Sequence, residues 1–274
     1  MSEPRVDTFD KANFNPRTNE WYKRAEPGLA ASKALAKIGE PAIDFLVSAQ
    51  RNQRVDIKIR NGATLTLGLI SSPKVPEALI TTLEEETNEH ISNVTAEVLY
   101  FYYYETSRIG DEHITGRLLA LVEKTDLSKE DRIRKFCAIK VLGGIKDKRS
   151  IQALIGALND ESGKYKQAAA KSLGEIGDIQ AAEALVSSLR AGNVSGDNIR
   201  AALAKMGSPA METIIAGLKN PNPLIRQGVA SFLNIIGDAR ALPALKEAVE
   251  DEDGHVRYWA NISLESIEAK IRNT

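Results

Sequence analysis

Three histidines and one cysteine are the residues of this chain best suited to catalysis or metal binding. His90, His113 and His255 lie far apart, and none has a second His or Cys at the spacing of a metal-ligand pair. Activating Cys137 as a nucleophile would require a neighbouring base or cation, so the sequence favours a small buried thiol. The chain also has no GxxxxGK[ST], GxGxxG, GxSxG or HExxH motif. We therefore expect no catalytic residues, no metal site and no cofactor.

An acidic cluster near the C-terminus, Asp251-Glu252-Asp253 with His255, has the residue types of a cation site. It lacks the 12-residue loop with a terminal bidentate Glu that calcium loops use. The sequence favours a solvated turn.

Composition and charge exclude several classes of protein. The 274 residues are 43% apolar and 27% charged, with a formal net charge of −1. This balance argues against a strongly basic nucleic-acid binder or a basic membrane-surface protein. One Cys excludes a disulfide framework, and no apolar stretch approaches about 18 residues. We expect a soluble cytoplasmic protein that binds neither nucleic acid nor membrane.

A short anchor motif recurs along the chain at intervals of 30 to 39 residues, which is typical of a solenoid. Its eight copies are Ile38-Gly39-Glu40, Ile70-Ser71-Ser72, Ile109-Gly110-Asp111, Ile145-Lys146-Asp147, Ile176-Gly177-Asp178, Met206-Gly207-Ser208, Ile236-Gly237-Asp238 and Ile267-Glu268-Ala269.

Each copy of the anchor separates two segments with helical apolar spacing. Gly177 suits the left-handed residue that ends a first helix, and Asp178 suits the cap of a second helix. Almost nothing alternates with a period of two, so a sheet has little support. The predicted fold is all-α, an α-α superhelix of about seven to eight helix pairs over residues 27–274.

The repeated strings resemble a known family. YKQAAAKSLGEIGDIQAAEALVSSL, IRQGVASFLNIIGDARALPALKEAVEDED and VRYWANISLESI are similar to the HEAT-like repeats of phycobilisome-lyase proteins. The resemblance covers about residues 27–274 and implies a fold rather than an activity. HEAT-like hydroxylases of the deoxyhypusine type use His-Glu pairs to hold iron. Here the order is Glu89-His90 and Glu112-His113, so that activity is not expected.

Two functions follow from these observations. The first is a non-catalytic scaffold that binds another protein on its concave face. The second, implied by the resemblance alone, is a phycobilin lyase subunit or phycobiliprotein chaperone, with a bilin or a phycobiliprotein as partner.

The second helices conventionally line the concave face, and their polar positions are the candidate contacts. Small residues beside them predict a shallow groove for a helix or a flat ligand, although they could equally serve close packing within each pair. The candidates on the second helices are Gln152, Glu183, Ser187, Glu212 and Glu247.

The aromatic run from Tyr100 to Tyr104 is a further candidate. Five consecutive helical residues sweep more than a full turn, so they cannot all face one core. Tyr102, Tyr103 and Tyr104 are predicted either to contact a partner or to thicken the core at an irregular junction.

A basic residue recurs ten positions before most anchors. It predicts either a ladder of hydrogen bonds between an Asp or Asn of one turn and the next Arg or Lys, or a row of phosphate-binding cations. The ladder is favoured because the nearly neutral chain would attract a polyanion only weakly. The basic residues are Arg60, Lys135, Lys166, Arg226 and Arg257.

Both ends of the array have unusual features. Residues 1–26 lie outside the repeat and are predicted to form a polar N-terminal cap or, alternatively, a partner-binding arm. Near the other end, Trp259 occupies a position that most repeats fill with a smaller residue. It is predicted to plug the terminal core or to anchor a partner.

Overall fold

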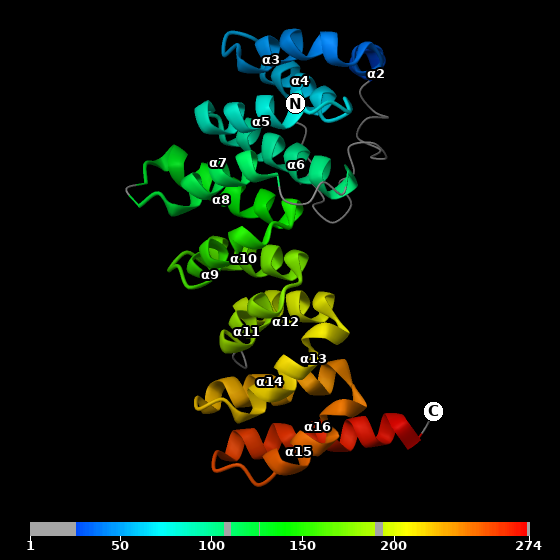
Figure 1. The fold of residues 1–274 in the computed structure, drawn as a ribbon, viewed down its shortest axis with the longest axis vertical. Coiled ribbons are helices and arrows are strands. Elements are labelled where there is room, and N and C mark those ends of the chain that lie inside the picture. Colours follow the sequence, from blue (N-terminus) through cyan, green and yellow to red (C-terminus); the bar gives the residue numbers. More distant parts are fainter. Residues whose placement is uncertain (1–25, 107–110, 126, 190–193, 273–274) are drawn as a thin grey trace, which may run out of the picture. The chain divides into compact units, whose positions relative to one another are not determined.

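The computed structural model describes residues 26–106, 111–125, 127–189 and 194–272, and within these ranges every regular element is a helix (Figure 1). The all-α repeat fold expected from the sequence is confirmed. The expected N-terminal cap falls almost entirely on residues outside the described ranges. The chain divides into two compact units, and one of the boundaries between them falls inside helix α8.

Unit 1 contains residues up to 107 together with 127–137. Its helices pack so that α2 contacts α4, α3 contacts α5, and α4 contacts α6. First helices therefore lie beside first helices, and second beside second. The elements are α2 (Glu26–Ile38), η1 (Glu40–Ala42), α3 (Ile43–Arg51), α4 (Ile57–Leu67), α5 (Lys74–Glu85), α6 (Glu89–Thr106) and the first part of α8 (Lys129–Ile145).

Unit 2 contains residues 108–126 and 138–274. Here α10 packs on α12 and α14 on α16, while α11 packs between α9 and α13. Besides the remainder of α8, the elements are α7 (Glu112–Glu123), η2 (Lys148–Ser150), α9 (Ile151–Leu158), α10 (Gly163–Ile176), α11 (Ile179–Ser187), α12 (Val194–Met206), η3 (Ser208–Ala210), α13 (Met211–Ala216), η4 (Gly217–Lys219), α14 (Pro223–Ile236), η5 (Ala239–Ala241), α15 (Leu242–Ala248) and α16 (Gly254–Arg272).

The anchor motif ends the first helix at most repeats, as the sequence predicts. Gly177 ends α10 with φ 68° and ψ 22°, a left-handed conformation that glycine adopts without strain. Asp178 then accepts a hydrogen bond from the Gln180 N–H and caps α11. Lys146 takes the glycine position after α8 and still has φ 56°. The last anchor differs, because Ile267 lies inside α16.

Glycines set the distance between successive first helices of unit 2. A Cβ atom placed on Gly143 would lie 2.7 Å from the Cα atom of Ser172, and one on Gly174 would lie 2.8 Å from the Cα atom of Ala202. Real Cβ atoms do not approach other atoms this closely, so only glycine allows these contacts. Phe232 stands on α14 where α10 has Ser172 and α12 has Ala202. The Phe232 ring is buried and prevents α12 and α14 from approaching each other equally closely.

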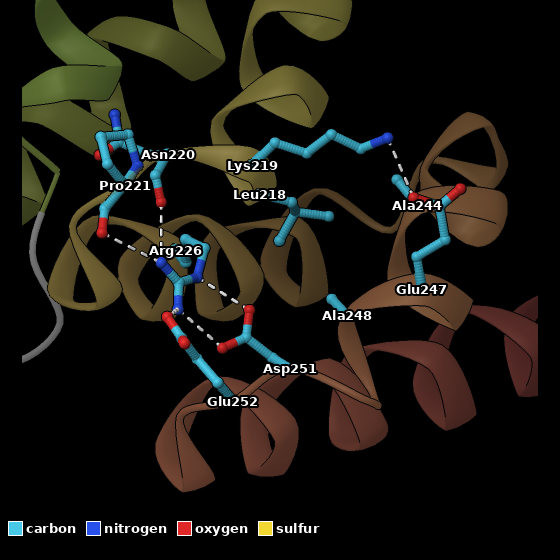
Figure 2. Close-up of a pocket in the computed structure, with 10 residues that line it drawn as sticks. All are labelled: Leu218, Lys219, Asn220, Pro221, Arg226, Ala244, Glu247, Ala248, Asp251 and Glu252. Carbon is cyan, nitrogen blue, oxygen red and sulfur yellow. Dashed lines mark hydrogen bonds and ion pairs between the residues drawn. The ribbon is translucent and has the colours of Figure 1, made fainter.

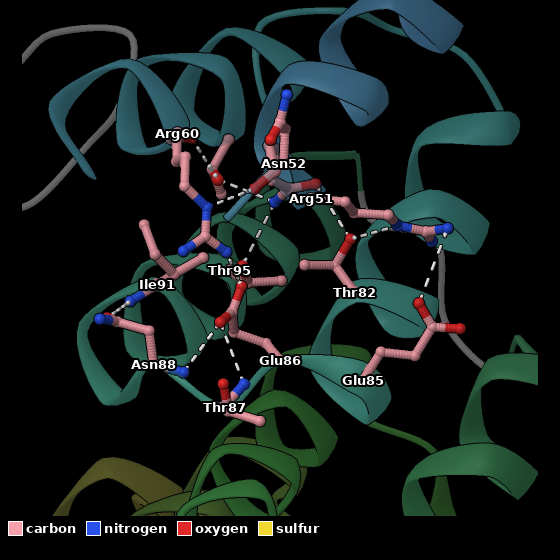
Figure 3. A network of polar contacts seen from close by, with 12 residues as sticks. Arg51, Asn52, Arg60, Thr82, Glu85, Glu86, Thr87, Asn88, Ile91 and Thr95 are labelled. Carbon is pink, nitrogen blue, oxygen red and sulfur yellow. Dashed lines mark hydrogen bonds and ion pairs between the residues drawn. The ribbon is translucent and has the colours of Figure 1, made fainter. Parts of the chain in front are cut away.

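The core of unit 1 contains a network of buried polar side chains that the sequence pattern does not indicate (Figure 3). Gln50 is fully buried; it donates to the Thr64 hydroxyl over 2.7 Å and accepts from the Thr82 hydroxyl over 3.0 Å. Arg60 donates to the Gln50 carbonyl over 2.7 Å and forms an ion pair with Glu86. Buried charges persist only when they are paired and hydrogen-bonded, so this network specifies how α3, α4 and α5 pack.

Candidate functional site

The second helices of unit 2 form the surface that carries the predicted contact residues. Helices α9, α11 and α13 lie side by side, and α15 contacts the η4 turn that follows α13. Helices packed in this way are about 8–10 Å apart. Equivalent side chains on successive helices are therefore displayed at a regular spacing.

Two rows of exposed residues on these helices are defined by their offset from one buried residue per helix. The buried residues are Leu154, Leu185, Ile214 and Leu245. The first row lies two positions before them and consists of Gln152, Glu183, Glu212 and Pro243. The second row lies two positions after them and consists of Gly156, Ser187, Ala216 and Glu247.

The two rows divide the predicted contact residues. Gln152, Glu183 and Glu212 share the first row, whereas Ser187 and Glu247 belong to the second. All five are exposed. The two sets differ in the sequence by their position relative to the buried residue of each helix, two residues before it or two residues after it. The first row thus contains two adjacent acids, Glu183 and Glu212, and lies beside a second row of small residues that ends at Glu247.

The carboxylates of this surface have different surroundings. Glu247 is paired with Lys219, whose Nζ lies 3.0 Å from its carboxylate. Glu212 acts electrostatically on Arg240, whose pKa is raised mainly by its hydrogen bond to Asp238 and to a smaller degree by Glu212. For Glu183, the described residues supply no ion pair. Its carboxylate is the one most available to a positively charged partner.

A cavity of about 440 Å³ lies beside the second row, between the α13–α14 and α15–α16 connections (Figure 2). Its walls include Lys219, Glu247 and the guanidinium of Arg226. Arg226 donates to Asp251 through Nε and Nη2, both over 2.8 Å, and Nη2 also bonds Glu252 over 3.1 Å. The arginine is therefore fully engaged within the protein.

The Arg226–Asp251 pair shifts the pKa values of both groups. Burial acts to raise the pKa of Asp251, but the hydrogen bonds from Arg226 and from the Asp253 backbone N–H, together with the positive charges of Arg226 and Arg257, outweigh it, and the net pKa lies below its ordinary value. The hydrogen bond to Asp251 raises the pKa of Arg226. The repeat pattern predicts hydrogen bonds between an Asp or Asn of one turn and the next Arg or Lys. The observed bond runs the other way along the chain, because the side chain of Arg226 reaches forward to Asp251 of the following turn.

The potential catalytic residues of the sequence do not assemble into a site. His90, His113 and His255 are exposed. Cys137 is fully buried, and its thiol donates to the Ser92 carbonyl with the sulfur 3.6 Å away. Among the residues that the structure describes, no three His, Cys, Asp or Glu side chains could hold a metal ion together.

The acidic turn has a structural role. Asp251 and Glu252 bind Arg226, and Asp253 accepts hydrogen bonds from the backbone N–H groups of His255 and Val256 at the start of α16. Its carboxylates are thus engaged within the turn and with Arg226.

The tyrosine run is divided between core and surface. Tyr102 and Tyr103 are 6% and 1% exposed, and the Tyr102 hydroxyl donates to the Ser72 carbonyl over 2.9 Å. Tyr104 is 49% exposed and stacks on Tyr100 with ring centroids 6.0 Å apart. A single contact patch is therefore not formed. Tyr102 and Tyr103 serve the core of unit 1, and Tyr104 is the member left at the surface.

A family model of HEAT repeats matches residues 118–204 and 198–265, which is more than half of the chain. The protein belongs to the HEAT-repeat family. This agrees with the repeat identified from the sequence.

No helix among the described residues has the length and apolar character needed to cross a membrane.

Individual known proteins resemble this chain in sequence or in fold. The chain is 28% identical over 171 residues to the uncharacterized phycocyanin operon protein Z of Pseudanabaena tenuis, covering 58% of this chain and 82% of the relative. The fold is similar to that of Kap95p in its complex with RanGDP, with TM-score 0.56, 14% identity, and coverage of 87% of this chain and 38% of the other. The CpcE–CpcF complex of phycocyanin lyase from Nostoc gives TM-score 0.46, 18% identity and coverage of 83% and 87%.

Proposed function

We propose that the protein is a non-catalytic scaffold that binds another protein on the second-helix surface of unit 2. The observation that carries this proposal is an exposed acidic residue of the first row beside a small residue of the second row, which occurs on the neighbouring helices α11 and α13 as Glu183 with Ser187 and Glu212 with Ala216. Small side chains allow a partner backbone to approach closely, and the carboxylates beside them select its charge.

The spacing of the acidic row indicates the chemistry of the partner. Glu183 and Glu212 stand on neighbouring helices, which are about 8–10 Å apart. Two turns of an α-helix advance about 11 Å, and three residues of an extended chain advance about 10 Å. A segment with Lys or Arg at either interval would place one cation on each carboxylate. The partner we expect is therefore a basic helix or extended peptide.

Charge reversal tests this proposal. The double variant Glu183→Lys/Glu212→Lys should recover about tenfold less of the bound protein from a host extract, because two attractive pairs become repulsive. Glu161→Lys is the matched control, since Glu161 is an exposed acid in the turn before α10. Melting temperatures should match those of the wild type. Equal recovery by the double variant and the wild type would refute the proposed surface.

A second candidate function is assistance in phycobiliprotein maturation, as a lyase subunit or chaperone. The similarity to phycocyanin operon protein Z over most of that relative supports it. The chain would be mixed with phycocyanobilin and an apo-phycocyanin subunit. A red-shifted, sharpened absorbance band that depends on the chain would support this function, and a spectrum identical to that of the mixture without the chain would count against it.

A further inference from the structure

Helix α16 exposes a stripe of residues whose counterparts on the preceding first helix, α14, are buried or half-buried. In α14 this stripe packs against α16, where the Ser263 hydroxyl donates to the Ala230 carbonyl over 2.7 Å. Arg226 and Ala230 of the stripe are 6% and 0% exposed. The equivalent residues of α16, 31 positions later, are all exposed. They are Arg257, Tyr258, Asn261 and Glu265.

Arg257 is held in the conformation that Arg226 uses to bind a carboxylate. Its Nη1 donates to the carbonyls six and five residues earlier, over 2.7 and 3.0 Å. Arg226 makes the same two contacts over 2.9 and 3.2 Å, and its Nε and Nη2 then bind Asp251. No carboxylate of the described residues bonds the Arg257 side chain. The guanidinium is therefore positioned for an acid on a partner surface.

The charges of the exposed stripe are complementary to those of a second copy of α16 that runs in the opposite direction. Arg257 and Glu265 each lie four residues from Asn261, or about 6 Å along the helix on opposite sides. Two copies of α16 packed antiparallel about Asn261 would place each arginine opposite the glutamate of the other copy. Tyr258, which is 58% exposed, and Leu264 stand three residues from the same centre and would also face each other. A parallel arrangement would instead bring like charges together.

We propose that a second copy of this chain docks on α16, antiparallel about a two-fold axis through Asn261, with Arg257 of each copy paired with Glu265 of the other. Opposite charges at positions related by the axis are what an isologous interface requires. One helix face buries less than about 1,000 Å², so the dimer should be weak, with a dissociation constant in the micromolar range.

Sedimentation velocity over about 1 to 200 µM protein tests the dimer. Arg257→Glu and Glu265→Arg should each weaken association at least about tenfold, because each creates two like-charge contacts across the axis. The double variant Arg257→Glu/Glu265→Arg should regain wild-type association, since its charges are again opposite. A wild-type chain that remains monomeric, or a double variant that does not recover, would overturn the proposal.

Cross-linking tests the position of the axis. Asn261→Cys should form a disulfide-linked dimer on mild oxidation, because the two new cysteines face each other at the axis. Gln152→Cys is the control, since Gln152 is exposed on α9 away from the stripe, and the native Cys137 is fully buried. Equal cross-linking of the two variants would refute this register. The variant Glu183→Lys/Glu212→Lys should dimerise like the wild type. Failure of the dimer proposal can therefore be distinguished from failure of the scaffold proposal.

Discussion

The contact between α10 and α12 predicts opposite effects for two glycine-to-alanine substitutions that are chemically identical. Gly174 lies in α10, where an added Cβ would be 2.8 Å from both Cα and Cβ of Ala202 and 3.1 Å from its carbonyl oxygen. Gly156 lies in α9, where an added Cβ would meet no atom within 4 Å. The two sites therefore differ in packing rather than in secondary structure.

The expected magnitudes follow from two opposing effects. Replacing a helical glycine by alanine stabilises by about 0.5–1 kcal/mol when the added methyl has space. Overpacking at a rigid contact costs about 1–3 kcal/mol, and two of the atoms near Gly174 are backbone atoms that cannot move alone. We expect Gly156→Ala to stabilise by about 0.5–1 kcal/mol and Gly174→Ala to destabilise by about 1 kcal/mol.

Thermal unfolding followed by circular dichroism measures both variants against the wild type. A change of about 1 kcal/mol shifts the Tm of a protein of this size by roughly 2–4 °C. The Tm of Gly174→Ala should fall and that of Gly156→Ala should rise. A Gly174→Ala variant as stable as Gly156→Ala would refute the close approach of the two first helices.

Three further predictions concern strain, buried charge and pH. Lys146→Gly should raise the free energy of unfolding by about 0.5–1 kcal/mol in urea titrations, because it relieves a positive φ. Glu86→Ala should cost about 3–5 kcal/mol in the same titrations, since it leaves the buried Arg60 unpaired. The lowered pKa of Asp251 stabilises the fold above the unfolded value of about 3.9, and this contribution is lost as pH falls through the folded pKa. Asp251→Asn should therefore flatten the decline in urea midpoint below about pH 4; an unchanged slope would argue against the bond to Arg226.

Much of the candidate surface was predictable from the sequence. Glu183 and Glu212 are recognisable because each precedes a buried apolar residue by two positions on a second helix. Glu247 lies in the other row, since it follows its buried residue by two positions. The burial of Tyr102 and Tyr103 was not predictable from composition, because the same aromatic run could serve a core or a surface.

The sequence by itself determined the repeat, the helical fold and the turn chemistry. These depend on interactions within about 30 residues, such as the positive φ of Gly177 and the cap provided by Asp178. Only the tertiary structure decided which side chains meet across repeats. The Arg226–Asp251 pair, the Gly174–Ala202 contact and the open face of α16 all depend on how one helix pair stacks on the next. That stacking is set by side-chain volume and buried hydrogen bonds between segments, which local periodicity does not encode.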